Sequence, residues 1–288
     1  MNVKELYGLF YLLLFMFISL DMTAQNGTGV YTHHVGAFSI NTLPESQGTG
    51  NTKILIGITP EMQEKYLPDG TFPNAVNAFL VKTPDRTILI DAGFGRKLFD
   101  HLEKLNTRPD QVDMILLTHM HGDHIGGLLR DGKKTFPNAE LYISAVEHDY
   151  WMKEGKEAQV NVINAYKSKL KLFDAQALNE AAPDLIPGVK AFAAYGHTPG
   201  HTAFLFESDG GKLFVWGDLT HAMKIQIPCP EVAVTYDVDP VMATQSRKEV
   251  LEYVSRHKIP IAGMHIAFPG MGEVASGQEG YIYKAFTP

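Results

Sequence analysis

Residues 113–127 read DMILLTHMHGDHIGG, an apolar run followed by a loop dense in histidine. The apolar half has β character, so we expect a buried strand that ends just before the histidines. Alternate residues of an extended segment point the same way, so His119 and His121 can hold one metal ion. Asp123 and His124 then turn toward a second ion. Packing gives no reason to place three histidines and an aspartate before two glycines, so this pattern predicts a metal site.

Histidine must carry any transition-metal chemistry, because the chain has 12 histidines and one cysteine. Cys229 alone cannot form an internal disulfide or a thiolate metal site, and we interpret it as a packed apolar residue. A lone histidine is more often a packed or surface residue than a ligand. That interpretation covers five histidines elsewhere in the chain: His33, His34, His101, His148 and His257.

The remaining ligands should follow other strands, since functional side chains sit on loops held by a rigid scaffold. His197 lies in the tight loop GHTPGH, Asp218 ends the run LFVWGD, and His265 follows the run IPIAGM. With the first loop they make five histidines and two aspartates. This set is large enough for two ions that share one carboxylate and leave a position for water.

Strands and helices alternate along the chain, which predicts an α/β fold with sheet inside and helices outside. Two similar hairpins are expected at residues 77–91 and 202–218, where apolar runs flank turn residues and the second run ends on an aspartate. The similarity between the two hairpins suggests two similar halves of the fold, although buried strands also resemble one another by chance. Further elements are expected from local patterns: a helix over 97–105, strands at 113–118, 139–144 and 259–264, and a helix that begins after Asp239-Pro240 and ends near His257.

Composition places the chain among folded proteins. The 288 residues are 45% hydrophobic and 20% charged, a balance that excludes a disordered chain. The net charge of −7 has the wrong sign for a protein that binds phosphate backbones, so nucleic acid is not expected as a partner.

The first 24 residues predict a signal peptide. Residues 6–20 carry no charge and follow Lys4 and Glu5, and the run is short for a membrane span but suits a signal-peptide core. We expect cleavage near Ala24 and a single domain over residues 25–288. The protein would then be periplasmic or secreted, without stable membrane insertion after processing. An uncleaved anchor and a buried N-terminal helix are the alternatives.

These motifs resemble the metallo-β-lactamase superfamily, whose HxHxDH signature matches residues 119–124 and whose later ligands follow in the same order. The resemblance covers most of the chain from about residue 77 onward. It implies an αβ/βα sandwich of two mixed β-sheets with helices on the outer faces. It also implies that Asp91 orients a ligand histidine. The implied ligand sets are His119, His121 and His197 for one zinc ion and Asp123, His124 and His265 for the other, with Asp218 as the bridge.

Other motifs narrow the branch of the family. Members that cleave β-lactams commonly have Cys or Ser where Asp218 stands, and redox members have Glu in place of the second histidine. Asp218 and His121 therefore favour a dinuclear hydrolase. The segments WGDLTH, DVDP and MHIAFPGMG, at residues 216–221, 237–240 and 264–272, resemble the branch that holds methyl parathion hydrolase and the N-acyl homoserine lactonases.

The expected chemistry follows from two zinc ions or other divalent ions. They would lower the pKa of a bridging water from about 15.7 toward neutrality, and the resulting hydroxide would open a lactone or ester. Asp123 and Asp218 are the expected catalytic carboxylates, with Asp123 passing a proton to the leaving group. N-acyl homoserine or aliphatic lactones are the expected substrates, a specificity that would make the enzyme quorum quenching. Phosphotriester hydrolysis, weak β-lactam cleavage and a non-catalytic metal-binding protein of the same fold are the alternatives.

Residues beside the ligands are expected to support them or to meet the substrate. We expect His201 to support the ligands and His221 to contact substrate. Phe94, Trp151 and Phe268 are expected to line an apolar substrate pocket. The uncharged Leu219 and Thr220, with Phe268, Pro269 and Met271, suggest an apolar mouth. Core packing is the alternative for the aromatic residues. A homodimer is left open.

Overall fold

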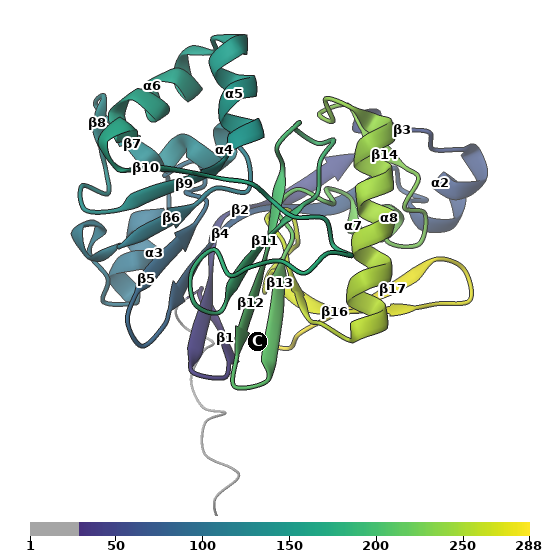
Figure 1. The fold of residues 1–288 in the computed structure, drawn as a ribbon. Helices are drawn as coiled ribbons and strands as arrows, with labels where there is room; N and C mark the ends of the chain where they lie inside the picture. Colours follow the sequence, from purple (N-terminus) through teal and green to yellow (C-terminus); the bar gives the residue numbers. More distant parts are fainter. Residues whose placement is uncertain (1–28) are drawn as a thin grey trace, which may run out of the picture.

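The computed structural model describes residues 29–288, and within them two β-sheets form the centre of the molecule (Figure 1). Part of the first sheet is antiparallel, from β1 through β2 and β4 to β5, and the rest is parallel, from β5 through β6 and β9 to β10. In spatial order its strands are β1 (Tyr31–Val35), β2 (Phe38–Asn51), β4 (Thr71–Lys82), β5 (Thr87–Ile90), β6 (Met114–Leu116), β9 (Glu140–Ser144) and β10 (Leu170–Phe173).

The second sheet is also mixed, because β13 and β15 pair parallel and its other neighbours pair antiparallel. In spatial order its strands are β11 (Val189–Ala193), β12 (Thr202–Ser208), β13 (Gly211–Val215), β15 (Ile261–Ala262), β16 (Met271–Ser276) and β17 (Tyr281–Ala285). Two short pairs complete the strands: β3 (Leu55–Ile56) with β14 (Ala233–Val234), and β7 (Leu129–Arg130) with β8 (Lys133–Lys134).

Helices cover the outer faces, with α3 to α6 against the first sheet and α8 against the second (Figure 1). The helices are α2 (Pro60–Tyr66), α3 (Leu98–Lys104), α4 (Gly122–Ile125), α5 (Ala145–Glu154), α6 (Glu157–Tyr166), α7 (Met223–Gln226) and α8 (Pro240–His257). Short 3-10 turns lie at Thr52–Ile54, Pro109–Gln111, Gly126–Leu128 and Lys167–Lys169.

Alternation along the central strands creates the layers. On β5, Ile88 and Ile90 pack between the two sheets, whereas Leu89 packs under the helices of the first sheet. On β13, Val215 joins the core between the sheets and Phe214 joins the core under α8. Successive side chains of a strand point to opposite faces, so strands buried on both faces are apolar throughout. The result is a rigid scaffold from whose strand ends the loops project.

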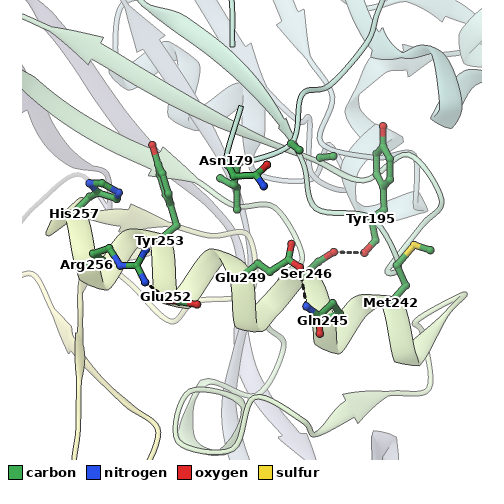
Figure 2. Close-up of a pocket in the computed structure, with 13 residues that line it drawn as sticks. Asn179, Tyr195, Met242, Gln245, Ser246, Glu249, Glu252, Tyr253, Arg256 and His257 are labelled. Atoms are coloured by element: carbon green, nitrogen blue, oxygen red, sulfur yellow. Dashed lines mark hydrogen bonds and ion pairs between the residues drawn. The ribbon is translucent and has the colours of Figure 1, made fainter. Parts of the chain in front are cut away.

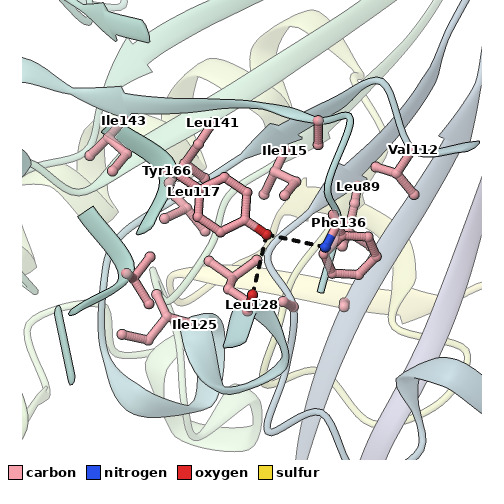
Figure 3. Packing of buried hydrophobic residues seen from close by; sticks show 14 of the residues in the cluster. Leu89, Val112, Ile115, Leu117, Ile125, Leu128, Phe136, Leu141, Ile143 and Tyr166 are labelled. Carbon is pink, nitrogen blue, oxygen red and sulfur yellow. Dashed lines mark hydrogen bonds between the residues drawn. The ribbon is translucent and has the colours of Figure 1, made fainter. Parts of the chain in front are cut away.

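The core under α5 and α6 reaches the loop that follows the histidine motif (Figure 3). The Tyr166 hydroxyl donates to the Leu128 carbonyl (3.2 Å) and accepts from the Phe136 N–H (3.3 Å). A buried phenol needs such partners, and these contacts fix the residues after α4 against the sheet.

The predicted sandwich of two mixed sheets with outer helices is confirmed. Both predicted hairpins form, as β4–β5 and β12–β13. Helix α8 begins at Pro240, where the Asp239 side chain accepts from the Met242 N–H, and it ends at His257. Strand β2 was not expected from the sequence, because residues 44–51 read PESQGTGN and lack the alternation that marks a strand.

The predicted signal peptide at residues 1–24 lies outside the described residues. Between residues 29 and 288, no helix combines the length and the apolar character that crossing a membrane would require. Cys229 is buried in a small core beside α2 and α7, which agrees with its interpretation as a packed residue.

Candidate metal centre

The predicted ligands gather on loops that adjoin strands of both sheets. His119 and His121 follow β6 in the first sheet. Asp218 follows β13 and His265 follows β15, whereas His197 lies on the loop that leads into β12. Residues more than a hundred positions apart in sequence therefore meet in one place.

A first donor group consists of His119, His121, His197 and Asp218. The Nδ1 atom of His121 lies 3.1 Å from His119 Nε2 and 3.0 Å from His197 Nε2. His197 Nε2 lies 3.3 Å from Asp218 Oδ2. Ligand atoms about 2.0–2.2 Å from one tetrahedral ion are separated by roughly this amount. The four side chains are therefore spaced to bind a single ion.

A second donor group consists of Asp123, His124 and His265. Asp123 Oδ2 lies 3.6 Å from His265 Nε2, and Asp123 Oδ1 lies 3.8 Å from His124 Nε2. The two histidines are buried, but the Asp123 side chain is 23% exposed. This group is wider than the first and opens toward solvent.

Asp218 lies between the two groups and is buried. Its Oδ2 atom lies 2.9 Å from His265 Nε2 as well as 3.3 Å from His197 Nε2. Its Oδ1 atom lies 3.2 Å from His124 Nε2. One carboxylate thus faces nitrogen atoms of both groups, the position that a bridging ligand needs.

The outer ring nitrogens of three histidines donate to buried acceptors. Because Nδ1 of each ring is held in this way, Nε2 is the ring nitrogen that faces the centre and is placed to bind an ion. The three contacts are His124 Nδ1 to Asp91 (2.7 Å), His197 Nδ1 to Asp237 (2.8 Å) and His265 Nδ1 to the Ala75 carbonyl (2.6 Å).

Two inward atoms show that the centre fits a cation. His124 Nε2 and Asp218 Oδ1 are buried and have no hydrogen-bond partner within residues 29–288. Leaving a buried polar group unsatisfied costs about 1–3 kcal/mol, more when it is charged. An ion between the two donor groups would satisfy both atoms, and imidazole with carboxylate is a ligand set that Zn²⁺ accepts.

The side chains at the centre differ in charge. Burial opposes the charged form of His197, but Asp218 and Asp237 outweigh it and raise the pKa of His197 to about 9, so an ion bound there would displace a proton. Burial lowers the pKa of His121 to about 3, so this ring is neutral at pH 7. Burial opposes the charged form of Asp218, but His124 and His265 outweigh it and hold the pKa of Asp218 well below its usual range. Asp218 is therefore ionised.

Asp91 contacts the histidine whose orientation it was predicted to fix. Besides His124, its carboxylate accepts from the Thr118 N–H (2.8 Å) and the Thr118 hydroxyl (2.7 Å). The residue is fully buried and has φ of 54°, a conformation that Asp and Asn adopt more readily than most residues. This carboxylate thus ties the strand end of β6 to the second donor group.

His201 and His221 lie beside the ligands but differ in whether both ring nitrogens are hydrogen-bonded. His201 uses both nitrogens, because Nδ1 donates to the Ala194 carbonyl (2.9 Å) and Nε2 accepts from the Asp218 N–H (2.9 Å). It therefore holds the backbone of Asp218, and neither ring nitrogen is free to bind an ion. His221 Nε2 lies 3.2 Å from Asp218 Oδ2, its ring stacks on that of His265, and these three side chains are close enough to hold an ion together. Its Nδ1 atom is buried and has no hydrogen-bond partner among residues 29–288.

The aromatic residues predicted to form a pocket differ in exposure. Phe94 is 37% exposed on the loop after β5, and Phe268 is partly buried. Trp151 is only 6% exposed, packs edge-on against His121 with the ring centroids 5.8 Å apart, and donates its indole N–H to Glu147. Trp151 therefore lies behind a ligand rather than on an open surface.

Leu219 and Met271 do not form an exposed mouth, contrary to the sequence-based expectation. Leu219 belongs to the core under α8, and Met271 belongs to the core between the sheets. Their apolar character serves packing of the second sheet.

The sequence analysis assigned no role to Asp237 or Arg247. Asp237 accepts from His197 and from the Val234 N–H (3.0 Å). The buried Arg247 guanidinium of α8 lies 4.0 Å from Asp237 and donates to the Leu219 carbonyl (2.7 Å). A DVDP motif and one arginine in an amphipathic helix carry no local signal of these contacts.

A separate cleft of about 830 Å³ lies beside α8 (Figure 2). Tyr195, Glu249 and Arg256 are among its lining residues, and the Ser246 hydroxyl donates to the Tyr195 carbonyl (2.6 Å) at one end. None of the predicted ligands lines this cleft. The candidate site is therefore the histidine and aspartate centre.

Comparisons with known proteins agree with this fold and with a metal-dependent hydrolase. Residues 71–256 match the family described as the metallo-beta-lactamase superfamily. A solved structure described as hydrolase AbOPH in the beta lactamase superfamily is 29% identical, with a TM-score of 0.80 over 91% of this chain and 98% of that chain. AidC, described as a dizinc quorum-quenching lactonase in complex with an N-acylated homoserine product, is 28% identical, with a TM-score of 0.80 over 90% of this chain and 98% of that chain.

Curated relatives match over shorter segments. YobT of Bacillus subtilis (strain 168), described as uncharacterized, is 30% identical over 47% of this chain and 58% of its own length. N-acyl homoserine lactonase AiiA of Bacillus thuringiensis subsp. kurstaki is 24% identical over 56% of this chain and 59% of its own length. The chain thus spans less than two thirds of the length of these curated relatives.

Proposed function

The chain belongs to the metallo-beta-lactamase superfamily, and on this basis we propose that it is a hydrolase with two divalent ions, zinc in the first instance, that opens lactones or related esters. N-acyl homoserine and aliphatic lactones are the proposed substrates. Similarity over nine tenths of the chain to a dizinc lactonase supports this choice.

The observation that carries the proposal is the convergence of two donor groups on Asp218. Its carboxylate lies within 3.3 Å of nitrogen atoms from His124, His197 and His265, although these residues come from three separate loops. A buried carboxylate that faces the Nε2 atoms of three imidazoles suits metal binding better than it suits stability, because burying charged groups is costly.

Ions bound at the two groups would supply an activated water and an electrophilic contact for a carbonyl oxygen. Asp123 is partly exposed while the histidines around it are buried, so its carboxylate is placed to carry a proton to the leaving alkoxide. His221 approaches Asp218 from the side of Tyr236, a half-exposed residue whose ring centroid lies 5.8 Å from that of His221. His221 itself is buried, so we propose that it meets only the part of the substrate that reaches the centre beside Asp218.

A substrate panel tests the reaction class. Purified metal-loaded enzyme is assayed with N-acyl homoserine lactones, aliphatic lactones, aryl esters, phosphotriesters and a cephalosporin. We expect the highest kcat/KM on a lactone, because a lactone offers a carbonyl oxygen and a leaving alkoxide and needs no cationic clamp. Faster hydrolysis of a phosphotriester or of the cephalosporin than of every lactone would refute the lactonase proposal and leave the metal centre standing.

Metal content tests the dinuclear proposal. Elemental analysis of active, fully loaded enzyme should give two ions per chain, one for each donor group. One ion per chain in fully active enzyme would exclude the two-ion mechanism.

We also propose that the protein is exported and processed near Ala24, as the uncharged run of residues 6–20 suggests. Mass spectrometry of native material should find an N-terminus near Gln25 outside the cytoplasm. An intact Met1 in a soluble cytoplasmic fraction would contradict this.

A further inference from the structure

Glu147 lies in the first turn of α5, is almost fully buried, and accepts four hydrogen bonds. Its Oε1 atom accepts from the Met120 N–H (2.9 Å) and the Trp151 indole N–H (2.6 Å). Its Oε2 atom accepts from the Thr198 hydroxyl (2.6 Å) and the Gly200 N–H (3.1 Å). Because every partner donates and an ionised carboxylate offers about four acceptor sites, the ionised form satisfies all of them.

Three of these four partners belong to the two loops that supply the imidazoles of the first donor group, and the fourth, Trp151, lies in α5 itself. Met120 stands between His119 and His121, and Thr198 follows His197 directly. One buried carboxylate therefore joins loops that are 76 residues apart at their histidines.

The junction is closely packed from both sides. A Cβ atom at Gly200 would lie 2.1 Å from the Glu147 backbone nitrogen, so only glycine lets this loop approach α5 so closely. On the other side, Gln159 Nε2 donates to the Met120 carbonyl (2.7 Å). The Met120 peptide is thus held through both its N–H and its C=O.

We propose that Glu147 is a positioning residue for the first donor group. It sets the separation between the loop of His119 and His121 and the loop of His197, and so determines how tightly one of the two ions is held. This inference rests on the proposed metal-dependent function. Ligands that are already in place bind an ion more tightly, because the cost of ordering them falls on folding rather than on binding.

The test is Glu147→Gln, which keeps the shape of the side chain but replaces one acceptor oxygen with a donor NH₂. Two of the four donors then lose their partner. We expect the affinity for one Zn²⁺ ion to fall about 10- to 100-fold, as for other groups that orient ligands, while the affinity for the other ion stays unchanged. Competition titration with a chromophoric chelator measures both affinities, and Co²⁺ substitution should show a changed visible spectrum for the weakened ion.

Glu45→Gln is the matched control. Glu45 is also a buried carboxylate, and it accepts from the N–H groups of Arg96 and Lys97 (both 2.8 Å) ahead of α3, neither of which lies on the loops of the first donor group. Both variants should lower the Tm of the metal-free protein, and only Glu147→Gln should change ion affinity. Equal weakening of both ions in Glu147→Gln, or the same weakening in Glu45→Gln, would overturn the proposal.

Thr198→Val provides a milder variant, since it removes one donor and keeps the side-chain shape. It should weaken the same ion by less than Glu147→Gln does. If Glu147→Gln fails to fold, unchanged ion affinity in Thr198→Val overturns the proposal. Wild-type protein that binds no ion would instead refute the proposed function, so the two failures are distinguishable.

Discussion

The two donor groups of the centre differ in spacing and support. In the first group, imidazole nitrogens lie about 3 Å apart, and Glu147 and Asp237 hold their loops from two directions. In the second group, the distances from Asp123 to the histidines are 3.6 and 3.8 Å, and Asp123 itself reaches solvent. Under the proposed two-ion function, the first group should retain its ion and the second should exchange protons and ligands. We therefore expect substitutions in the two groups to separate metal affinity from turnover.

Asp218→Ala should have the largest effect, because it removes the one carboxylate that faces both groups. Loss of several kcal/mol of charge stabilisation at the reacting centre corresponds to about a thousandfold or more in kcat/KM. Lactone assays and elemental analysis on the same sample measure turnover and retained metal. Activity near the wild-type level would mean that the two donor groups do not depend on a shared carboxylate. It would contradict the role of Asp218 as a bridging ligand.

What the sequence could predict is what local pattern encodes. The HxHxDH loop, both hairpins and α8 are each written in a continuous stretch, through alternation, turn residues and an N-cap. The partners that orient the ligands are not. Glu147 meets Met120 from 27 positions away, and the Ala75 carbonyl meets His265 from 190 positions away. Such contacts depend on how two sheets pack, and a backbone carbonyl has no residue type to reveal it.

The same reason explains the error at the predicted mouth. Leu219 and Met271 were assigned to a pocket because they are apolar and near ligands in sequence, yet both pack into cores. Apolar character beside a ligand does not tell which face of a strand end a residue occupies. That face is set by how the strand pairs within its sheet.

Asp123→Asn should rank second and act on turnover more than on metal. Asn keeps an oxygen that can bind an ion but cannot carry a proton, and general acid catalysis contributes about a hundredfold or more. The loss should therefore be large for an aliphatic lactone, whose alkoxide needs a proton, and small for a nitrophenyl ester, whose leaving group does not. Equal losses on both substrates would show that Asp123 serves only as a ligand.

Asp91→Asn and Asp237→Asn form a matched pair with smaller effects. Each replaces a carboxylate that accepts from a ligand histidine, His124 in the second group and His197 in the first. Each should weaken one ion about 10- to 100-fold. The pair should weaken different ions, and Asp91→Asn should be the more severe because Asp91 also accepts twice from Thr118. Chelator competition gives both affinities, and weakening of the same ion by both variants would contradict the assignment of the groups.

Phe94→Ala should have the smallest effect and should leave the metal centre intact. Phe94 is 37% exposed, and its backbone packs against Gly126, two residues after His124 in the second group, where a Cβ would lie 2.9 Å from Phe94 Cα. An exposed aromatic ring beside the open group is placed to contact an acyl chain, and losing it should cost about 1 kcal/mol of binding. KM for a long-chain lactone should then rise about fivefold, with kcat and metal content unchanged and a short-chain lactone little affected. Leu172→Ala, at a residue of similar exposure on the distant β10, serves as the control and should change neither KM. If KM for the long-chain lactone does not move in Phe94→Ala, the ring serves only its contact with the Arg96 guanidinium, 4.8 Å from the ring centroid, and the acyl chain is bound elsewhere.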